Sequence, residues 1–498
     1  MVFSSQVFVF YFLPLTLLLY YLMPWRGRHL VLTLLSYLFY GWANPLFVVL
    51  LLFSTLVDYV CGLTMVGSGP LWLARLTGAR RIEAHRAAPL SALTPGATRA
   101  RRQRVALAVS VCTNVALLGF FKYFNFGVES YDALLTMLGL DGLRLDLAVR
   151  VTLPLGISFY TFQSMSYTID VYRGHAAPLR SFIDFACYVS MFPQLVAGPI
   201  IRFSEVADQF LHRTCTLTKF ARGAAFISIG LVKKILLANP CGQAADLAFG
   251  AASLPPLDAW YGVTAYGFQI YFDFSAYSDM AIGLGLMLGF VFPKNFDSPY
   301  RSASITEFWR RWHISLSSWL RDYLYVPLGG SRRGRRRTYV NLLLVMLLGG
   351  LWHGAAWTFV CWGGLHGAML ALERRRGKTA VYNRLPRPLR VGATFVTVSV
   401  GWVFFRAADL PDALRYLQTM VGLRAVEPAG TLLAGVLYQP YFLGTMAVAA
   451  GVTWGCPQTW DWTRRLTLPR AGLTAAALVV ALALLSTQAY NPFIYFIF

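Results

Sequence analysis

Long apolar segments recur along the whole chain, from Val7 to Phe498, and most of them approach the roughly 20 residues that an α-helix needs to cross a bilayer. Charged residues make up only 13% of the sequence, whereas soluble domains carry about 25%. Because backbone groups in hydrocarbon must be hydrogen-bonded within the protein, repeated segments of this length are typical of membrane helices. The sequence therefore predicts an all-α polytopic membrane protein. No break in composition separates a second domain, so we expect residues 1–498 to form one integral-membrane unit.

The apolar segments predict roughly 10–12 spans plus re-entrant helices. Proline, glycine and polar residues interrupt 151–171 and 181–201, which is typical of kinked or re-entrant helices that line a protein interior. Asp273 and Asp279 interrupt 261–292, which we expect to be nearly a helical hairpin, and 127–150 reads as a loop. The other predicted spans are 7–23, 30–42, 46–66, 105–126, 223–239, 339–357, 358–373, 391–405, 432–454 and 471–488.

The positive charge of the chain lies between the apolar segments. The net charge is +22 at pH 7, and arginine clusters occur in 67–104, 332–337 and 374–378. This distribution is the positive-inside pattern, so 67–104 is expected to be a cytoplasmic basic loop and counting spans places the C-terminus outside. Anionic lipid headgroups are the expected partners of these loops. The charge is thereby explained without a nucleic-acid partner.

A tryptophan- and arginine-rich stretch occupies 304–322. Ser304 and Glu307 have the spacing of a capping box, which predicts a helix that starts at Ile305, and Glu307 can pair with Arg310 or Arg311. His313 lies on this amphipathic helix. The pattern is equally compatible with a plain interfacial anchor and with part of a functional site.

A second histidine, His353, lies deep in an apolar segment within Gly349-Gly350-Leu351-Trp352-His353-Gly354. Burial disfavours the cationic imidazole, and a neutral imidazole is what a general base needs at neutral pH. The glycines around it allow another helix or an extended substrate to approach closely. A histidine that only bonds neighbouring helices together is the alternative. His366 lies in a similar glycine setting and is expected to be structural.

Several kinds of chemistry have no sequence support. The chain has no phosphate-binding glycine loop with lysine, no Gly-x-Ser-x-Gly motif and no metal-ligand spacing among its seven cysteines, so neither a metal nor a bound cofactor is expected. Two histidines beside a basic, aromatic entrance suit acyl transfer from a phosphate-bearing thioester. A transporter or flippase of a lipid-linked or acyl-bearing substrate, without covalent chemistry, is the alternative. That alternative draws on the intramembrane aspartates Asp58, Asp170, Asp184, Asp273 and Asp279.

The chain resembles the membrane-bound O-acyltransferase family, in its bacterial alginate O-acetyltransferase-like branch. The stretches that carry the likeness are Met1–Ser5, Leu155–Tyr160, Ile169–Gly174, Ala197–Ile200, Tyr271–Asp279, 304–330 and Gly349–Gly354. The resemblance implies a central funnel that narrows to a tunnel, with 300–367 as the catalytic core segment. It implies that His353 is the essential histidine and His313 a second important one. It also implies acetyl-CoA as the acyl donor, and a periplasmic acetyltransferase partner that modifies an exopolysaccharide on the outer side of the bacterial inner membrane.

The last residues, 489–498, form an aromatic tail that is apolar but too short to span a membrane. We expect the tail to return into the outer cavity of the protein. It resembles the C-terminal motif of the small partner peptide in teichoic-acid D-alanylation, which suggests that Tyr495 carries the acetyl group. An aromatic anchor at the membrane interface is the alternative.

Overall fold

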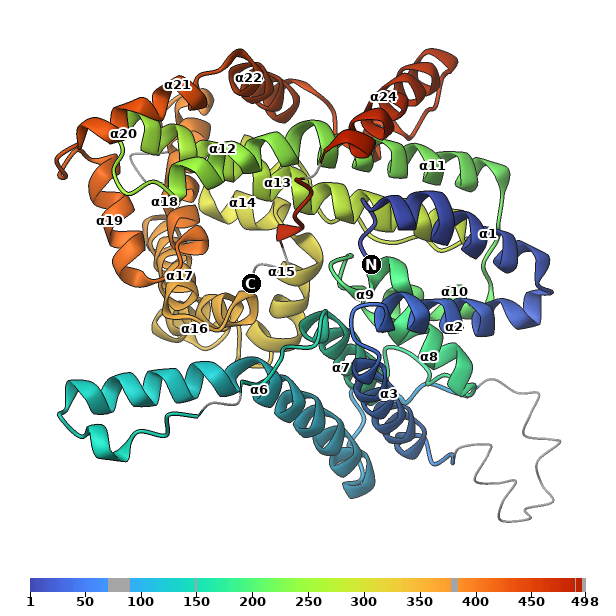
Figure 1. Ribbon diagram of the computed structural model, residues 1–498. Helices are drawn as coiled ribbons and strands as arrows, with labels where there is room; N and C mark the ends of the chain where they lie inside the picture. Colours follow the sequence, from blue (N-terminus) through green and yellow to red (C-terminus); the bar gives the residue numbers. More distant parts are fainter. Residues whose placement is uncertain (70–89, 148–149, 378–383, 489, 495–498) are drawn as a thin grey trace, which may run out of the picture.

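The computed structural model describes residues 1–69, 90–147, 150–377, 384–488 and 490–494, and all regular structure in these ranges is helical. The prediction of an all-α protein is confirmed. The N-terminal part of the chain, residues 1–211, builds one side of the molecule (Figure 1). Its helices are η1 (Phe8–Phe12), α1 (Leu13–Leu22), α2 (Arg28–Gly41), α3 (Leu46–Met65), α6 (Arg101–Met137), α7 (Ile157–Arg173), α8 (Phe182–Ser190), α9 (Phe192–Leu195) and α10 (Phe203–Leu211).

The rest of the chain covers the other side and holds both histidines of the candidate site. Its longer helices pack in two groups: α11 and α12 lie against α13, while α17 lies between α16 and α18 and contacts both (Figure 1). The helices are α11 (Leu217–Val232), η4 (Lys233–Ala238), α12 (Asn239–Phe249), α13 (Pro256–Met287), α14 (Ile305–Arg311), α15 (Ile314–Leu320), η6 (Arg321–Tyr325), α16 (Gly334–His353), α17 (Trp357–Arg376), α18 (Arg387–Arg406), α19 (Leu410–Met420), α20 (Pro428–Leu432), α21 (Ala434–Leu437), α22 (Pro440–Gly455), α23 (Thr459–Trp462) and α24 (Leu468–Thr487).

Four helices in the described ranges are long and apolar enough to cross a membrane: α3, α6, α18 and α24. A fifth span is possible if the bent pair Gly430–Leu437 and Pro440–Gly455, which meets at 67°, counts as one. The remaining helices are shorter or carry many polar residues. The segment 432–454, expected as one span, is therefore broken in the region of Tyr438 and Gln439.

Helix α13 is the central element of this part of the chain, and 26 of its 32 residues are buried. The predicted hairpin is wrong, because α13 runs unbroken through Asp273 and Asp279. Lys234 lies 2.8 Å from Asp273 and Lys233 lies 2.7 Å from Asp279, so η4 neutralises both carboxylates from the side. Because each carboxylate is paired with a lysine, it can stay buried in a continuous helix, and no loop is needed to carry it to water.

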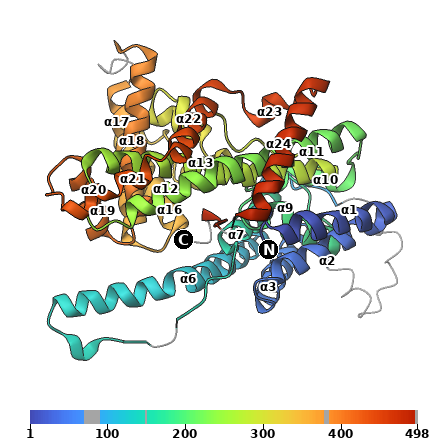
Figure 2. The same ribbon diagram turned by 45° about the horizontal axis from the view of Figure 1, so that its top comes forward.

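Helix α6 is longer than expected. It continues to Met137, so residues 127–137 are helical and the predicted loop begins eleven residues later than expected. At about 1.5 Å per residue, 37 residues span roughly 55 Å, well beyond the roughly 30 Å of a hydrocarbon core. The C-terminal half of α6 accordingly extends away from the helical body in both views (Figures 1 and 2).

The stretch 304–322 begins as predicted and then departs from the prediction. The Ser304 hydroxyl accepts a hydrogen bond from the Glu307 amide at 3.0 Å, so α14 starts at Ile305. The chain then breaks at His313, whose φ is +42°, and α15 starts afresh at Ile314. His313 is 0% exposed and Trp312 is 2% exposed. The prediction of one interfacial amphipathic helix is therefore wrong, because the break turns these side chains into the protein interior.

Candidate active site

His353 is the last residue of α16, and its side chain is enclosed by aromatic rings. The exposed fraction of the residue is 9%. The ring centroids of Trp352, Trp362 and Phe405 lie 5.0, 5.2 and 5.2 Å from that of the imidazole. The predicted burial of His353 is confirmed, and such an apolar shell favours the uncharged imidazole that a base requires.

The glycines beside His353 allow α17 to approach. A Cβ on Gly350 would lie 2.2 Å from the Phe359 carbonyl oxygen, and a Cβ on Gly354 would lie 2.0 Å from the Phe359 ring. Neither position tolerates a side chain unless the two helices move apart. The glycines therefore serve the close packing of α16 on α17, which aligns the tryptophan and phenylalanine rings around the histidine.

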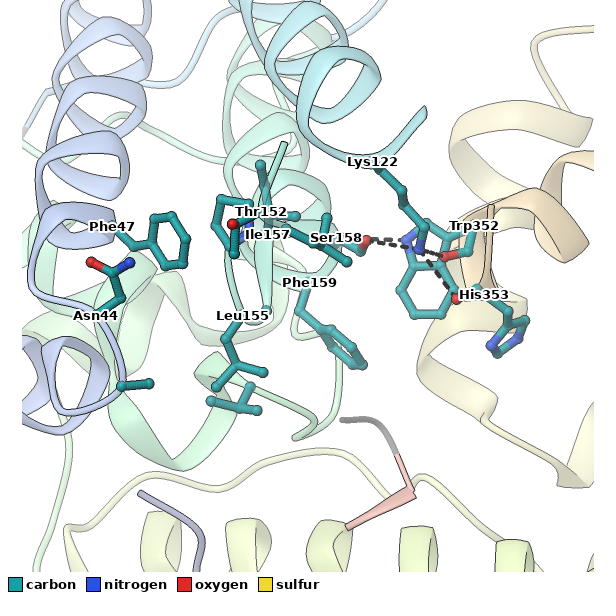
Figure 3. A pocket seen from close by; sticks show the side chains of 15 residues that line it. Asn44, Phe47, Lys122, Thr152, Leu155, Ile157, Ser158, Phe159, Trp352 and His353 are labelled. Atoms are coloured by element: carbon teal, nitrogen blue, oxygen red, sulfur yellow. Dashed lines mark hydrogen bonds between the residues drawn. The ribbon is translucent and has the colours of Figure 1, made fainter. Parts of the chain in front are cut away.

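Two cavities meet at His353. The first, which we call the α7 cavity, has a volume of about 470 Å³ and is lined by residues from 43–47 and 152–159, by Lys122 and by Trp352 (Figure 3). The second, which we call the arginine cavity, has a volume of about 410 Å³ and lies between α14, α15, α16 and α17. Among the described residues, His353 alone lines both cavities. His353 is therefore part of the wall of each cavity.

The arginine cavity combines an apolar wall with a basic rim. Leu342, Val345 and Met346 of α16 contribute the apolar surface, and Arg310, Arg321 and Arg374 contribute guanidinium groups. Such a cavity suits a ligand with an apolar or neutral arm and phosphate groups at its end. Within the described ranges, no group of three His, Cys, Asp or Glu side chains is close enough to hold a metal ion.

His313 lies near His353 but lines neither cavity. Trp352 stands between the two histidines, with ring centroids 6.0 Å from His313 and 5.0 Å from His353. Nδ1 of His313 lies 3.2 Å from Oδ1 of Asn295, while Nε2 is buried without a hydrogen-bond partner in the described part of the chain. The structure thus brings both predicted histidines into one aromatic cluster, and separates them by a single indole ring.

The third predicted histidine, His366, lies farther from the cavities, and Trp362 contacts both its ring and that of His353. Its ring is buried against Trp362, at 4.9 Å between centroids, and its Nδ1 accepts a hydrogen bond from the Trp309 indole at 3.3 Å. This contact ties α17 to α14. A structural role for His366 stays a prediction that agrees with this arrangement.

The aromatic tail returns into the protein, as expected, for residues 490–494. The Ile494 amide donates to Asp273 at 2.9 Å, and Phe493 stacks on Tyr277 with 4.6 Å between ring centroids. Lys234 donates a hydrogen bond to the Pro492 carbonyl. Tyr495, the predicted acyl carrier, lies outside the described residues.

Lys122 is a site residue that the sequence analysis did not single out. It projects from α6 to the end of α16, where it contacts backbone oxygens of Trp352 and His353 and the Ser158 hydroxyl (Figure 3). A signal was present in the sequence, since Lys122 interrupts the predicted apolar span 105–126. Charged residues within such segments usually have a function.

The five aspartates that supported a transporter are all engaged within the protein. They connect helices and neighbouring segments, and none lines the α7 cavity or the arginine cavity. Their partners are Asn114 for Asp58 at 2.8 Å, Tyr323 for Asp170 at 2.7 Å, His29 for Asp184 at 2.6 Å, Lys234 for Asp273 at 2.8 Å and Lys233 for Asp279 at 2.7 Å. The transport alternative therefore gains no support from them.

Comparison with known proteins agrees with this geometry. A probable alginate O-acetylase AlgI from Azotobacter vinelandii is 42% identical over 531 residues, with all of both chains covered. The chain belongs to the membrane-bound O-acyltransferase family. The family model matches residues 173–376, which include both histidines of the site.

Two further relatives differ in the substrate that their names give. A probable alginate O-acetylase AlgI from Pseudomonas putida is 43% identical over 524 residues, again with full coverage of both chains. A peptidoglycan O-acetyltransferase from Helicobacter pylori is 36% identical over 462 residues, covering 86% of this chain and 81% of that protein. This protein is accordingly a multi-pass membrane-bound O-acyltransferase, as the resemblance predicted.

Proposed function

We propose that this O-acyltransferase takes acetyl groups from cytoplasmic acetyl-CoA and passes them across the bacterial inner membrane for O-acetylation of an exopolysaccharide of the alginate type. The observation that carries the proposal is the position of His353, at which the arginine cavity and the α7 cavity meet. An enzyme that passes an acyl group between two sides of a membrane needs its base at such a meeting point. The names of the alginate and peptidoglycan relatives support a polysaccharide as the final acceptor.

The arginine cavity is the proposed donor site. The basic loops beside it support a cytoplasmic position under the positive-inside rule. Acetyl-CoA carries several phosphates and a narrow, largely neutral arm that ends in the thioester. Arg310, Arg321 and Arg374 offer guanidinium groups to the phosphates, and the apolar wall of α16 offers a path for the arm toward His353.

The proposed chemistry is one acyl transfer at His353. The neutral imidazole takes the proton of an acceptor hydroxyl while that oxygen attacks the thioester carbonyl. The tetrahedral intermediate collapses, the carbon–sulfur bond breaks, and the thiolate takes up the proton from the imidazolium. The products are free CoA and an acetyl ester of the acceptor, so atoms and charges balance.

The proposed first acceptor is the phenol of Tyr495, which would form an acetyl-tyrosine ester. Ile494 is held by Asp273 on α13, and the adjacent Phe274 packs on His313 with 4.6 Å between ring centroids. Tyr495 directly follows this anchored residue in the sequence. A periplasmic acetyltransferase partner then takes the acetyl group from Tyr495 and places it on the polymer.

The experiment uses purified full-length protein in lipid nanodiscs with radiolabelled acetyl-CoA, and it measures CoA release and label on the protein. The His353→Ala variant is expected to lose CoA release. The His212→Ala variant, which changes an exposed histidine at the end of α10, is expected to keep it. CoA release by His353→Ala at the wild-type rate would rule out the proposed role of His353. Vectorial flux of substrate without any CoA release would show a transporter instead.

A further inference from the structure

The C-terminal end of α16 lacks the closure that most helices provide for themselves. The last carbonyl groups of a helix have no partner within the helix, and a following residue in the left-handed conformation commonly satisfies them. Gly354 follows His353 with a φ of −152°, so the chain leaves α16 in an extended conformation. Among the described residues that follow α16 in the chain, only Gly354 bonds one of these carbonyls, with its amide 3.2 Å from the Gly350 oxygen.

Helix α6 supplies the missing partners. The Tyr123 hydroxyl donates to the Leu351 carbonyl at 2.8 Å. The Lys122 ammonium donates to the Trp352 carbonyl and, at 3.2 Å, to the His353 carbonyl. With the Gly354 bond, all four terminal carbonyls of α16 are thereby satisfied, three of them by two adjacent residues of α6.

All hydrogen-bond donors of the Lys122 ammonium have neutral acceptors. Its three N–H donors match three acceptors, the two carbonyls and the Ser158 hydroxyl at 3.3 Å. Within the described part of the chain, no carboxylate forms an ion pair with it. The negative end of the α16 dipole is the compensating charge, and a lysine at this place is favourable for that reason. A neutral side chain could cap the carbonyls only in part.

Lys122 does not contact the atoms that react in the proposed acyl transfer. It reaches the backbone of His353, while the imidazole points to the opposite side (Figure 3). No hydrogen bond within the described ranges holds that imidazole, so its position depends on the backbone and on the aromatic rings around it. We propose that Lys122, assisted by Tyr123, is the positioning residue that fixes the end of α16 and thereby holds His353 at the junction of the two cavities. This inference rests on the proposed role of His353 as the base.

The test compares Lys122→Met, Lys122→Arg and the matched control Lys219→Met. Lys219 also donates to carbonyls and a hydroxyl, at 3.0–3.4 Å, but it does so at the start of α11, and it lines neither cavity. A displacement of about 1 Å at a catalytic group costs on the order of 100-fold in rate, so Lys122→Met should lower kcat by about that factor. Its KM for acetyl-CoA should stay within about twofold, because Lys122 does not line the arginine cavity.

Chemical rescue separates positioning from a general loss of structure. Methionine is one atom shorter than lysine and lacks the ammonium, and the α7 cavity of about 470 Å³ beside position 122 leaves room for a small amine. Ethylammonium should restore most of the lost kcat of Lys122→Met, and Lys122→Arg should retain most of it unaided. Lys219→Met should match the wild type throughout. Unchanged kcat in Lys122→Met, or a loss that neither ethylammonium nor arginine restores, would overturn the proposal.

A second readout tests the positioning role of Lys122 without acetyl transfer. Diethyl pyrocarbonate modifies neutral imidazoles, and mass spectrometry can follow its rate at His353 alone. Loosening of the α16 end should raise that rate in Lys122→Met, and ethylammonium should return it to the wild-type value. If the wild type transfers no acetyl group, the proposed function fails while this rate still decides the role of Lys122. An unchanged labelling rate would contradict the positioning role of Lys122 even if His353 is the base.

Discussion

The side-chain oxygen of Asn295 lies 3.2 Å from Nδ1 of His313 and fixes which imidazole nitrogen carries the proton. The Ser315 amide, which can only donate, points at the same oxygen at 3.2 Å, and this contact identifies it as the carbonyl oxygen of Asn295. Nδ1 of His313 must therefore be the donor. Nε2 consequently carries the lone pair, and it has no partner among the described residues.

We expect Asn295→Ala to impair acetyl transfer nearly as much as His313→Ala. Without the oxygen acceptor, the tautomer and ring orientation of His313 are no longer set, and a displacement of about 1 Å beside the catalytic group costs on the order of 100-fold in rate. Initial rates of CoA release measure the effect. Asn125→Ala is the matched control, because Asn125 bonds the backbone of Val151 away from both histidines. Full activity of Asn295→Ala would show that the orientation of His313 is irrelevant.

Removal of an arginine from the rim of the arginine cavity should weaken donor binding. Arg374→Ala is expected to raise the KM for acetyl-CoA about tenfold or more, since a hydrogen bond to a charged group is worth roughly 1.5–3 kcal/mol. The kcat should change little because Arg374 lies at the rim, remote from the reacting atoms. Steady-state kinetics give both constants. The adjacent Arg375 does not line the cavity, so Arg375→Ala should keep the wild-type KM, and equal effects of the two variants would argue against a specific donor site.

Gly350→Ala should destabilise the pairing of α16 with α17. The new methyl group would lie 2.2 Å from the Phe359 carbonyl oxygen, so the backbones must separate. Overpacking of this kind costs about 1–3 kcal/mol, which lowers the midpoint of thermal unfolding in detergent. Gly364→Ala changes the same helix pair, but its Cβ would meet Leu347 at an ordinary 3.7 Å. Equal melting temperatures for Gly350→Ala and Gly364→Ala would contradict the requirement for glycine.

Tyr495→Phe should abolish transfer of acetyl groups to the partner while expression stays at the wild-type level. The phenol oxygen is the proposed carrier, and phenylalanine removes that oxygen alone. Polysaccharide acetylation in cells and acetyl-tyrosine detected by mass spectrometry measure the outcome. Tyr441→Phe, which changes an exposed tyrosine on α22, serves as the control. Normal acetylation by Tyr495→Phe would leave the tail with a purely structural role.

Acid should destabilise the region around Asp322. A hydrogen bond from Arg321, together with the charges of Arg321 and Arg202, holds the pKa of the Asp322 carboxyl below its usual value. The folded state then binds fewer protons than the unfolded state, whose aspartates titrate near pH ~3.9, so stability falls as the pH drops below about 4. Thermal unfolding between pH 7 and pH 3 should show a smaller loss for Asp322→Asn. Parallel losses in both proteins would exclude this linkage.

Parts of the site could be predicted because they depend on neighbours in sequence. The helix start at Ile305 follows from Ser304 and Glu307, which bond within one turn. The helix pair α16 and α17 follows from two apolar segments around a glycine-rich turn. The burial of His353 follows from the apolar residues on both sides of it.

Other parts depend on contacts between distant segments, and the sequence analysis missed them. The break at His313 relies on Asn295, and the unbroken course of α13 relies on Lys233 and Lys234. In each case a polar side chain interrupts the apolar pattern of one segment, and its hydrogen-bond or ion-pair partner lies in another segment. Hydrophobic periodicity cannot reveal such a partner, because it describes only the residues within one segment.

The sequence by itself determined that the chain forms membrane helices, that its charge lies between them, and that two histidines occur in apolar and aromatic surroundings. These features follow from hydrophobicity and local hydrogen bonding, which act over a few residues. Only the tertiary structure decided that His353 is shared by two cavities, that Trp352 separates it from His313, and that Lys122 closes the end of its helix. Those relationships arise when α6, α7, α14 and α17 pack around α16, because unsatisfied carbonyls and buried charges must find partners wherever the fold brings them.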